Sequence, residues 1–162
     1  MGGSGRTTSV LFVCLGNICR SPLAHVVFED LVRSRGLSDR IEVDSCGTGA
    51  WHVGGGADPG SAAVAARHGL DLSEHRARQL RRTDAETFEW IVCMDRSNVR
   101  NTRRDTGRPD LDVVLLRDHD PEGGSDVPDP WAQGRGAFDE VYDIVARSSA
   151  ALLDAVVARL DP

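Results

Sequence analysis

Cys14 and Arg20 are six positions apart near the start of the chain, in the segment VLFVCLGNICRSP that covers residues 10–22. A cysteine thiolate is a nucleophile, and an arginine guanidinium can donate two parallel hydrogen bonds to two phosphate oxygens. Composition alone predicts the pattern Cys-x5-Arg-Ser roughly 0.03 times in such a chain. The pattern therefore indicates nucleophilic chemistry on a phosphate group. The alternative is that Cys14 is a small buried hydrophobic residue and Arg20 a surface cation.

The elements around this pair must place both side chains at one anion. The apolar residues before Cys14 predict a strand that ends at the cysteine, and Pro22 fits the first turn of a following helix. The backbone N–H groups of residues 15–20 can then surround an anion at the helix N-terminus, where the helix dipole favours negative charge. The predicted phosphate-binding loop consists of Leu15, Gly16, Asn17, Ile18, Cys19 and Ser21.

Four short apolar runs rich in Val, Ile and Leu alternate with stretches that suit helices. Apolar runs of this kind are typical of strands covered on both faces, so we expect a parallel sheet with crossover helices. The predicted fold class is α/β, a single three-layer domain with a four-stranded, parallel, twisted sheet and helices on both faces. The expected strands are residues 9–14, 41–44, 90–94 and 113–116, and the expected helices are residues 22–35, 61–68, 97–104 and 138–160.

The chain of 162 residues, with a formal net charge of −6, is long enough for one compact domain. We expect a flexible tail over residues 1–8 and one domain over residues 9–162. The acidic balance argues against nucleic-acid binding, and no apolar run approaches the roughly 20 residues that cross a membrane. Four cysteines without a paired spacing suit neither a disulfide scaffold nor a zinc site. We therefore expect a reduced, cytoplasmic protein without metal or other cofactor.

Several segments together resemble one enzyme family, the low-molecular-weight protein tyrosine phosphatases. The resemblance is carried by CLGNICRSP (14–22), SCGTGAWHVG (45–54), HRARQ (75–79), IVCMDRSN (91–98), VPDPW (127–131) and FDEVY (138–142). It implies a metal-independent hydrolase of phosphotyrosine in proteins and of small aryl phosphates. The reaction would pass through a cysteinyl-phosphate on Cys14, with Arg20 as the phosphate clamp.

The resemblance also implies a general acid and a set of supporting residues. The family places the acid in an Asp-Pro dipeptide, which occurs here at Asp58, Asp120, Asp129 and Asp161. We choose Asp129, because Trp131 follows it and can stack on a phenyl ring, although this aspartate could instead cap a loop. By resemblance, Ser21 donates a hydrogen bond to the Cys14 thiolate, and Asn17, Ser45 and His75 support the loop. Asp95 is expected to do the same, while Trp51 and Trp131 form the walls of the substrate cleft.

The sequence departs from the family pattern at His25, where Glu is usual, and at Cys46, where Ala is usual. We assign neither residue a part in the reaction. Three other functions remain open. An arsenate reductase would need further cysteines near Cys14, and a protein arginine phosphatase usually has Thr at the position of Ile18. A phosphotyrosine-binding module without turnover would be expected to lack Cys14 or Asp129.

Cys14 and Cys19 lie on one short loop, so a peroxide-oxidised Cys14 could be captured by Cys19 as a disulfide. The alternative is that Cys19 fills the loop and its sulfur is out of reach. The implied partners are a phosphotyrosine-containing protein substrate, for which a tyrosine kinase is one candidate, and phosphate-like anions in the site. We expect a monomer that binds neither nucleic acid nor membranes.

Overall fold

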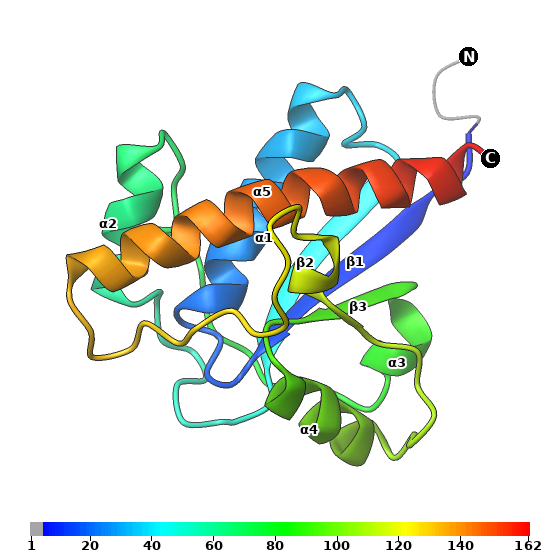
Figure 1. Ribbon diagram of the computed structural model, residues 1–162. Coiled ribbons are helices and arrows are strands. Elements are labelled where there is room, and N and C mark those ends of the chain that lie inside the picture. The colour runs from blue at the N-terminus through cyan, green and yellow to red at the C-terminus, as the bar shows by residue number, and fades with distance from the viewer. Residues whose placement is uncertain (1–4) are drawn as a thin grey trace.

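The computed structural model describes residues 5–162, within which four parallel strands form one twisted sheet (Figure 1). The strands are β1 (Thr8–Cys14), β2 (Ile41–Gly47), β3 (Trp90–Cys93) and β4 (Val114–Leu115), in the spatial order β2-β1-β3-β4. Helices cover both faces of this sheet. The predicted α/β fold, with a phosphate-binding loop after the first strand, is therefore confirmed.

The helices divide between the two faces of the sheet. They are α1 (Arg20–Ser34), α2 (Pro59–Arg67), α3 (Asp84–Thr87), α4 (Arg96–Thr106) and α5 (Arg135–Leu160), together with a short 3-10 helix, η1 (Leu116–His119). Figure 1 shows α1 crossed by the long α5 on one face, while α3 and α4 lie at the other. The four predicted helices are present as α1, α2, α4 and α5, with ends that differ by at most three residues.

β1 is one of the two inner strands, and it is buried on both faces. Val10 and Phe12 pack into the core beneath α1, α2 and α5, where Phe12 meets Phe28 edge to face with ring centroids 5.4 Å apart. Leu11 and Val13 belong to a second core on the opposite face. This two-sided burial explains the continuous apolar run before Cys14, the residue at which the strand ends.

The main differences from the predicted elements have local causes. β2 continues to Gly47 and not to residue 44, because Ser45, Cys46 and Gly47 stay in register with β1 up to the pair Cys14 and Gly47. α2 begins at Pro59, since the Asp58 carboxylate accepts a hydrogen bond from the Gly60 N–H at 2.8 Å and caps the helix. α3 and η1 are single turns of four residues each, too short for a periodic pattern to reveal.

The N-terminal boundary also differs slightly from the prediction. The predicted tail covers residues 1–8, of which residues 1–4 lie outside the described residues. Thr8 already belongs to β1, and its N–H donates to the Arg40 carbonyl oxygen at 2.9 Å. The sheet therefore begins one residue earlier than the predicted strand.

A buried carboxylate fastens α5 to η1. Asp120 accepts hydrogen bonds from Arg117 Nε at 2.9 Å, from Arg147 Nε at 2.8 Å and from the Glu122 N–H at 2.8 Å. Burial disfavours the charge of Asp120, but these hydrogen bonds and the charges of the arginines hold its pKa below the ordinary value. The carboxylate therefore stabilises the fold above its ordinary pKa, and this contribution is lost as the pH falls through the lower pKa of the folded state.

Replacing Asp120 by Asn should lower the free energy of unfolding at pH 7 by about 1–3 kcal/mol, because the two arginines lose their charged partner. Urea unfolding measures this difference, which should shrink as the pH falls toward 3. The matched control is Asp154→Asn in the exposed pair with Arg35, which should leave stability nearly unchanged. Wild-type stability of Asp120→Asn at pH 7 would contradict the assignment.

Candidate active site

Cys14 lies at the carboxyl end of β1, where the chain turns into a tight loop before α1. The cysteine is 2% exposed, and its sulfur is 3.3 Å from the Asn17 backbone nitrogen, which donates a hydrogen bond to it. Ser21, in the first turn of α1, places its Oγ 3.0 Å from the same sulfur. One backbone N–H and one hydroxyl therefore contact the sulfur atom.

The loop is held open by Asn17, which adopts a left-handed backbone conformation with φ of 55°. Its amide oxygen accepts a hydrogen bond from the Arg78 N–H at 3.0 Å. Its amide nitrogen then donates to Ser21 Oγ at 2.8 Å and to Ser45 Oγ at 3.1 Å. The amide oxygen and both hydrogens of the amide nitrogen thus have hydrogen-bond partners. These bonds offset the cost of a left-handed backbone at a residue with a side chain.

His75 supports the same loop from the segment between α2 and α3. Its Nε2 is 2.7 Å from the Asn17 carbonyl oxygen, so this ring nitrogen carries the hydrogen and donates it. Burial lowers the pKa of His75, an effect that the hydrogen bond to Asn17 partly opposes and that the nearby His25 increases. Both predicted supporting residues, Ser45 and His75, therefore contact the loop.

Gly47 allows the loop to pack against β2. A Cβ atom at this position would lie 2.7 Å from the Leu15 carbonyl oxygen and 3.0 Å from the Asn17 nitrogen, distances that only a shift of the backbone could relieve. The sequence analysis assigned no role to Gly47 or to Arg78. The only signal for them was their presence in the family-like segments 45–54 and 75–79.

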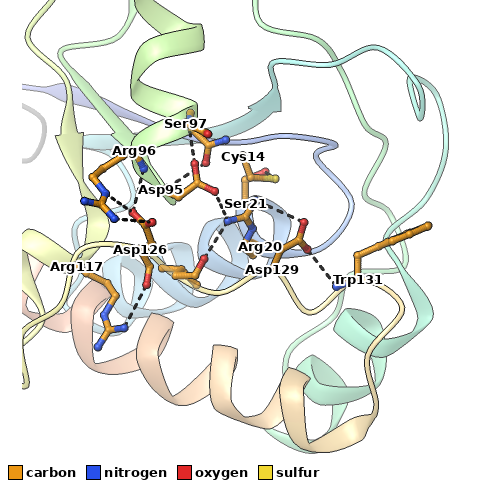
Figure 2. A network of polar contacts seen from close by, with 12 residues as sticks. Cys14, Arg20, Ser21, Asp95, Arg96, Ser97, Arg117, Asp126, Asp129 and Trp131 are labelled. Atoms are coloured by element: carbon orange, nitrogen blue, oxygen red, sulfur yellow. Dashed lines mark hydrogen bonds and ion pairs between the residues drawn. The ribbon is translucent and has the colours of Figure 1, made fainter.

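Arg20 opens α1 with its guanidinium directed back toward the cleft (Figure 2). The side chain is 4% exposed, and Nη1 donates to Asp95 Oδ2 at 2.8 Å and to the Val127 carbonyl oxygen at 2.9 Å. Burial opposes the charge, but Cys14 and Asp95 together raise the pKa of Arg20. Nη2 lies 3.8 Å from Asp129 Oδ2. Arg20 is therefore a fixed cation, anchored through one of its nitrogens.

Asp95 is positioned by the start of α4. Its second carboxylate oxygen accepts a hydrogen bond from the Asn98 N–H at 2.7 Å, and the Asn98 side chain accepts one from the Asp95 N–H at 3.1 Å. This capping box satisfies the first turn of the helix while it aims the other oxygen at Arg20. The contact agrees with the expected supporting role of Asp95.

The structure separates the four Asp-Pro aspartates by their surroundings. Asp58 caps α2, Asp120 is buried between two arginines, and Asp161 pairs with Arg40 at 2.7 Å near the C-terminus. Asp129 alone of the four lines the same cleft as Cys14, and its side chain is 46% exposed. Its Oδ1 accepts a hydrogen bond from the Trp131 N–H at 3.1 Å. Of the four Asp-Pro aspartates, Asp129 is thus the one that faces the cleft beside Cys14.

The cleft has a volume of about 270 Å³, with the phosphate-binding loop at its base. Trp51 and Trp131 line it and are 75% and 57% exposed, so each presents a broad aromatic surface to an incoming group. The sequence analysis missed His52, which also lines the cleft. Trp90 is buried in the core, and Cζ of Arg159 lies 4.5 Å from the centroid of its ring.

The remaining cysteines lie in apolar surroundings. All four cysteines are free, and burial raises the pKa of Cys46 and, to about 12, that of Cys93. Cys46 and Cys93 do not line the cleft, so neither is placed as the further thiol that an arsenate reductase needs. Among residues 5–162, no group of His, Cys, Asp and Glu could hold a metal ion. No helix in that range combines the length and apolar character needed to cross a membrane.

Comparisons with known proteins agree on one family. The family model described as low molecular weight phosphotyrosine protein phosphatase matches residues 9–161. A low molecular weight protein-tyrosine-phosphatase of Streptomyces coelicolor is 45% identical over 155 residues, which cover 93% of this chain and 94% of the relative. The human low molecular weight phosphotyrosine protein phosphatase is 38% identical over 151 residues, with 91% of this chain and 95% of the relative covered.

Solved structures show the same similarity. YfkJ from Bacillus subtilis superposes with a TM-score of 0.89 at 36% identity and covers 97% of this chain and 99% of its own. Wzb from Vibrio vulnificus, solved in complex with benzylphosphonate, superposes with a TM-score of 0.81 at 25% identity over 91% and 98% of the two chains. With the cysteine, arginine and aspartate gathered in one cleft, these matches show that the chain belongs to the low-molecular-weight protein tyrosine phosphatases, hydrolases of phosphotyrosine.

Proposed function

We propose that this phosphatase works through a cysteinyl-phosphate intermediate, with Cys14 as nucleophile, Arg20 as phosphate clamp and Asp129 as general acid and base. The observation that carries the proposal is that these three side chains line one cleft. In addition, Arg20 is fixed by Asp95 and Val127, while Asp129 is exposed to solvent. The clamp is rigid, and the acid is free to meet a substrate.

In the first step, the Cys14 thiolate attacks phosphorus in line with the tyrosine oxygen. The S–P bond forms as the P–O bond to tyrosine breaks, and Asp129 gives its proton to the departing phenolate oxygen. The loop N–H groups and Nη2 of Arg20, the nitrogen not held by Asp95 and Val127, bind the equatorial oxygens, whose charge is greatest in the transition state. Ser21 Oγ, 3.0 Å from the sulfur, donates its hydrogen to the thiolate.

In the second step, a water molecule attacks the phosphorus of the cysteinyl-phosphate. Asp129, now a carboxylate, takes a proton from the water while the S–P bond breaks and returns its electron pair to Cys14. Inorganic phosphate leaves. The Arg20 guanidinium and the loop N–H groups stabilise the phosphoryl oxygens in both steps, so the mechanism needs no metal to neutralise them.

The cleft favours an aryl ester as substrate. Ile18 lines it as an apolar surface, and Trp51 and Trp131 offer aromatic faces to a tyrosine ring. We therefore propose that the substrate group is phosphotyrosine and not phosphoarginine. The protein that carries it could be a tyrosine kinase. We also propose that the phosphatase acts as a monomer. Four free cysteines suit a reducing compartment, and we propose the cytoplasm.

Replacing Cys14 by Ser should abolish hydrolysis of p-nitrophenyl phosphate, because a serine hydroxyl is not ionised in this site. Binding of vanadate or phosphate should persist, since Arg20 and the loop N–H groups remain. Steady-state kinetics and isothermal titration calorimetry measure the two effects. More than a small residual rate in Cys14→Ser would overturn the proposed nucleophile.

Replacing Asp129 by Asn should slow turnover of phosphotyrosine by about 100- to 10,000-fold, because the leaving phenolate loses its proton donor. The loss should be smaller for aryl esters whose phenols are strong acids. Rates across a series of such esters measure this, with Asp126→Asn as control, since Asp126 pairs with Arg96 at 3.3 Å. Equal losses for good and poor leaving groups would contradict the assignment of Asp129.

We further propose that Cys19 protects Cys14 from lasting oxidation. Peroxide converts the Cys14 thiolate to a sulfenic acid and is itself reduced to water. The Cys19 sulfur then attacks the oxidised sulfur, the S–O bond breaks, and a second water leaves as the disulfide forms. Both cysteines line the same cleft, which supports this pairing. Burial, helped by the negative charge of Asp58, raises the pKa of Cys19, so capture should be faster in alkaline solution.

After brief treatment with peroxide and then dithiothreitol, wild type should recover more activity than Cys19→Ser. The advantage should be larger at pH 9 than at pH 7, because more of Cys19 is then thiolate. Cys93→Ser, which alters a buried cysteine away from the cleft, is the control and should recover as wild type does. Equal recovery of wild type and Cys19→Ser at both pH values would overturn the protective role.

A further inference from the structure

His25 contacts Ser45, which in turn contacts Asn17 of the phosphate-binding loop. The sequence suggested no role for this histidine. It projects from α1, and its Nδ1 is 3.2 Å from Ser45 Oγ on β2. Its Nε2 is 3.7 Å from Glu29 Oε2, one turn further along the helix. Ser45 is 3% exposed and touches Asn17, so the imidazole is linked to the turn that shapes the site.

The number of available hydrogens fixes the direction of the bonds that Asn17 makes and leaves one hydrogen on Ser45. The Arg78 N–H fixes the Asn17 amide oxygen as an acceptor, so both hydrogens of the amide nitrogen point away from it. One hydrogen goes to Ser21 Oγ and the other to Ser45 Oγ. Ser21 still has its own hydrogen, for which the Cys14 sulfur at 3.0 Å and the Cys46 carbonyl oxygen at 3.3 Å are the acceptors. Ser45 likewise has one hydrogen left.

The Ser45 hydroxyl has a single acceptor for that hydrogen within the described part of the chain, the Nδ1 of His25. A buried hydroxyl hydrogen without an acceptor is costly, so the lone pair of a neutral imidazole is needed here. We infer that His25 is a positioning residue, which accepts the Ser45 hydroxyl hydrogen and so orients the Asn17 turn. The neutral ring then carries its own hydrogen on Nε2, toward Glu29.

The inferred hydrogen bond requires that Nδ1 of His25 carries no hydrogen of its own. A protonated ring donates from Nδ1, and Ser45 Oγ would then face two donors while its own hydrogen had no acceptor. The charged and titratable groups around the ring are Glu29 on α1 and His75 from the segment after α2, whose pKa is lowered chiefly by burial and also by His25. On β2, Asp44 precedes Ser45 and pairs with Arg78 at 3.0 Å.

Two variants of similar size separate the acceptor from the volume of the side chain. His25→Asn can place an amide oxygen near the position of Nδ1, whereas His25→Leu offers none. His25→Leu should lower kcat/KM for p-nitrophenyl phosphate by about three- to tenfold and weaken vanadate binding by a similar factor, as expected for one hydrogen bond. His25→Asn should stay within about twofold of wild type at pH 7.5. The control is Asp30→Asn, on the same helix, where the Asp30 carboxylate pairs with the exposed Arg33; it should change neither value.

Recovery of function by the amide supplies a readout that a packing role would not move. His25→Asn should exceed His25→Leu in both kcat/KM and vanadate affinity, because only the amide oxygen can accept the Ser45 hydrogen. Ser45→Ala removes that hydroxyl and should lower both values at least as much as His25→Leu, which tests the contact even where His25→Leu fails to fold. Leu and Asn variants that behave alike, or wild-type values in Ser45→Ala, would overturn the inference.

This inference rests on the proposed cysteine mechanism, but different results would contradict the mechanism and the role of His25. Activity retained in Cys14→Ser would remove the mechanism itself. Wild-type activity and vanadate affinity in His25→Leu would remove only the role of His25, since hydrolysis by Cys14 would stand.

Discussion

A buried positive charge organises this active site. The Arg20 guanidinium is nearly inaccessible to water, and a cation in that position must be paired with anions and hydrogen-bond acceptors. Asp95, at the start of α4, and the Val127 carbonyl oxygen supply them through one nitrogen. Because those partners come from distant parts of the chain, Arg20 draws the loop after β1, the start of α4 and the segment that carries Asp129 to one point. Nη2 lies 3.8 Å from Asp129 Oδ2, beside the cleft that both residues line.

The second constraint is the turn at Asn17. Its left-handed backbone would be strained alone, and it is held by contacts to Arg78, Ser21 and Ser45 and by His75 on its carbonyl oxygen. β2 makes these contacts possible, because it extends to Gly47, where the absence of a side chain lets the loop approach. The rigid sheet and the polar network thus fix the donors before substrate arrives, so little reorganisation remains for the reaction itself.

Local patterns predicted the parts of the site that lie close together in sequence. The spacing of Cys14 and Arg20 located the loop, the apolar run before it located β1, and Trp131 beside Asp129 selected one aspartate of four. The end of β2 was wrong, because its last residues pack against the loop and leave no apolar run. Arg78 and His25 went without roles, since their contacts with Asn17 and Ser45 join separate elements. Such contacts depend on tertiary packing, which single-sequence periodicity does not encode.

The proposed reaction requires that the phosphoryl group is transferred first to the Cys14 sulfur and then to water. Its most direct test is rapid acid quenching of wild type during turnover of a phosphotyrosine peptide, followed by mass spectrometry of the proteolytic fragments. The account predicts one phosphoryl group on the fragment that contains Cys14, formed and lost at rates that match turnover. A phosphoryl group on another residue, or turnover without any phosphorylated fragment when a known cysteinyl-phosphate enzyme yields one under the same quench, would contradict it.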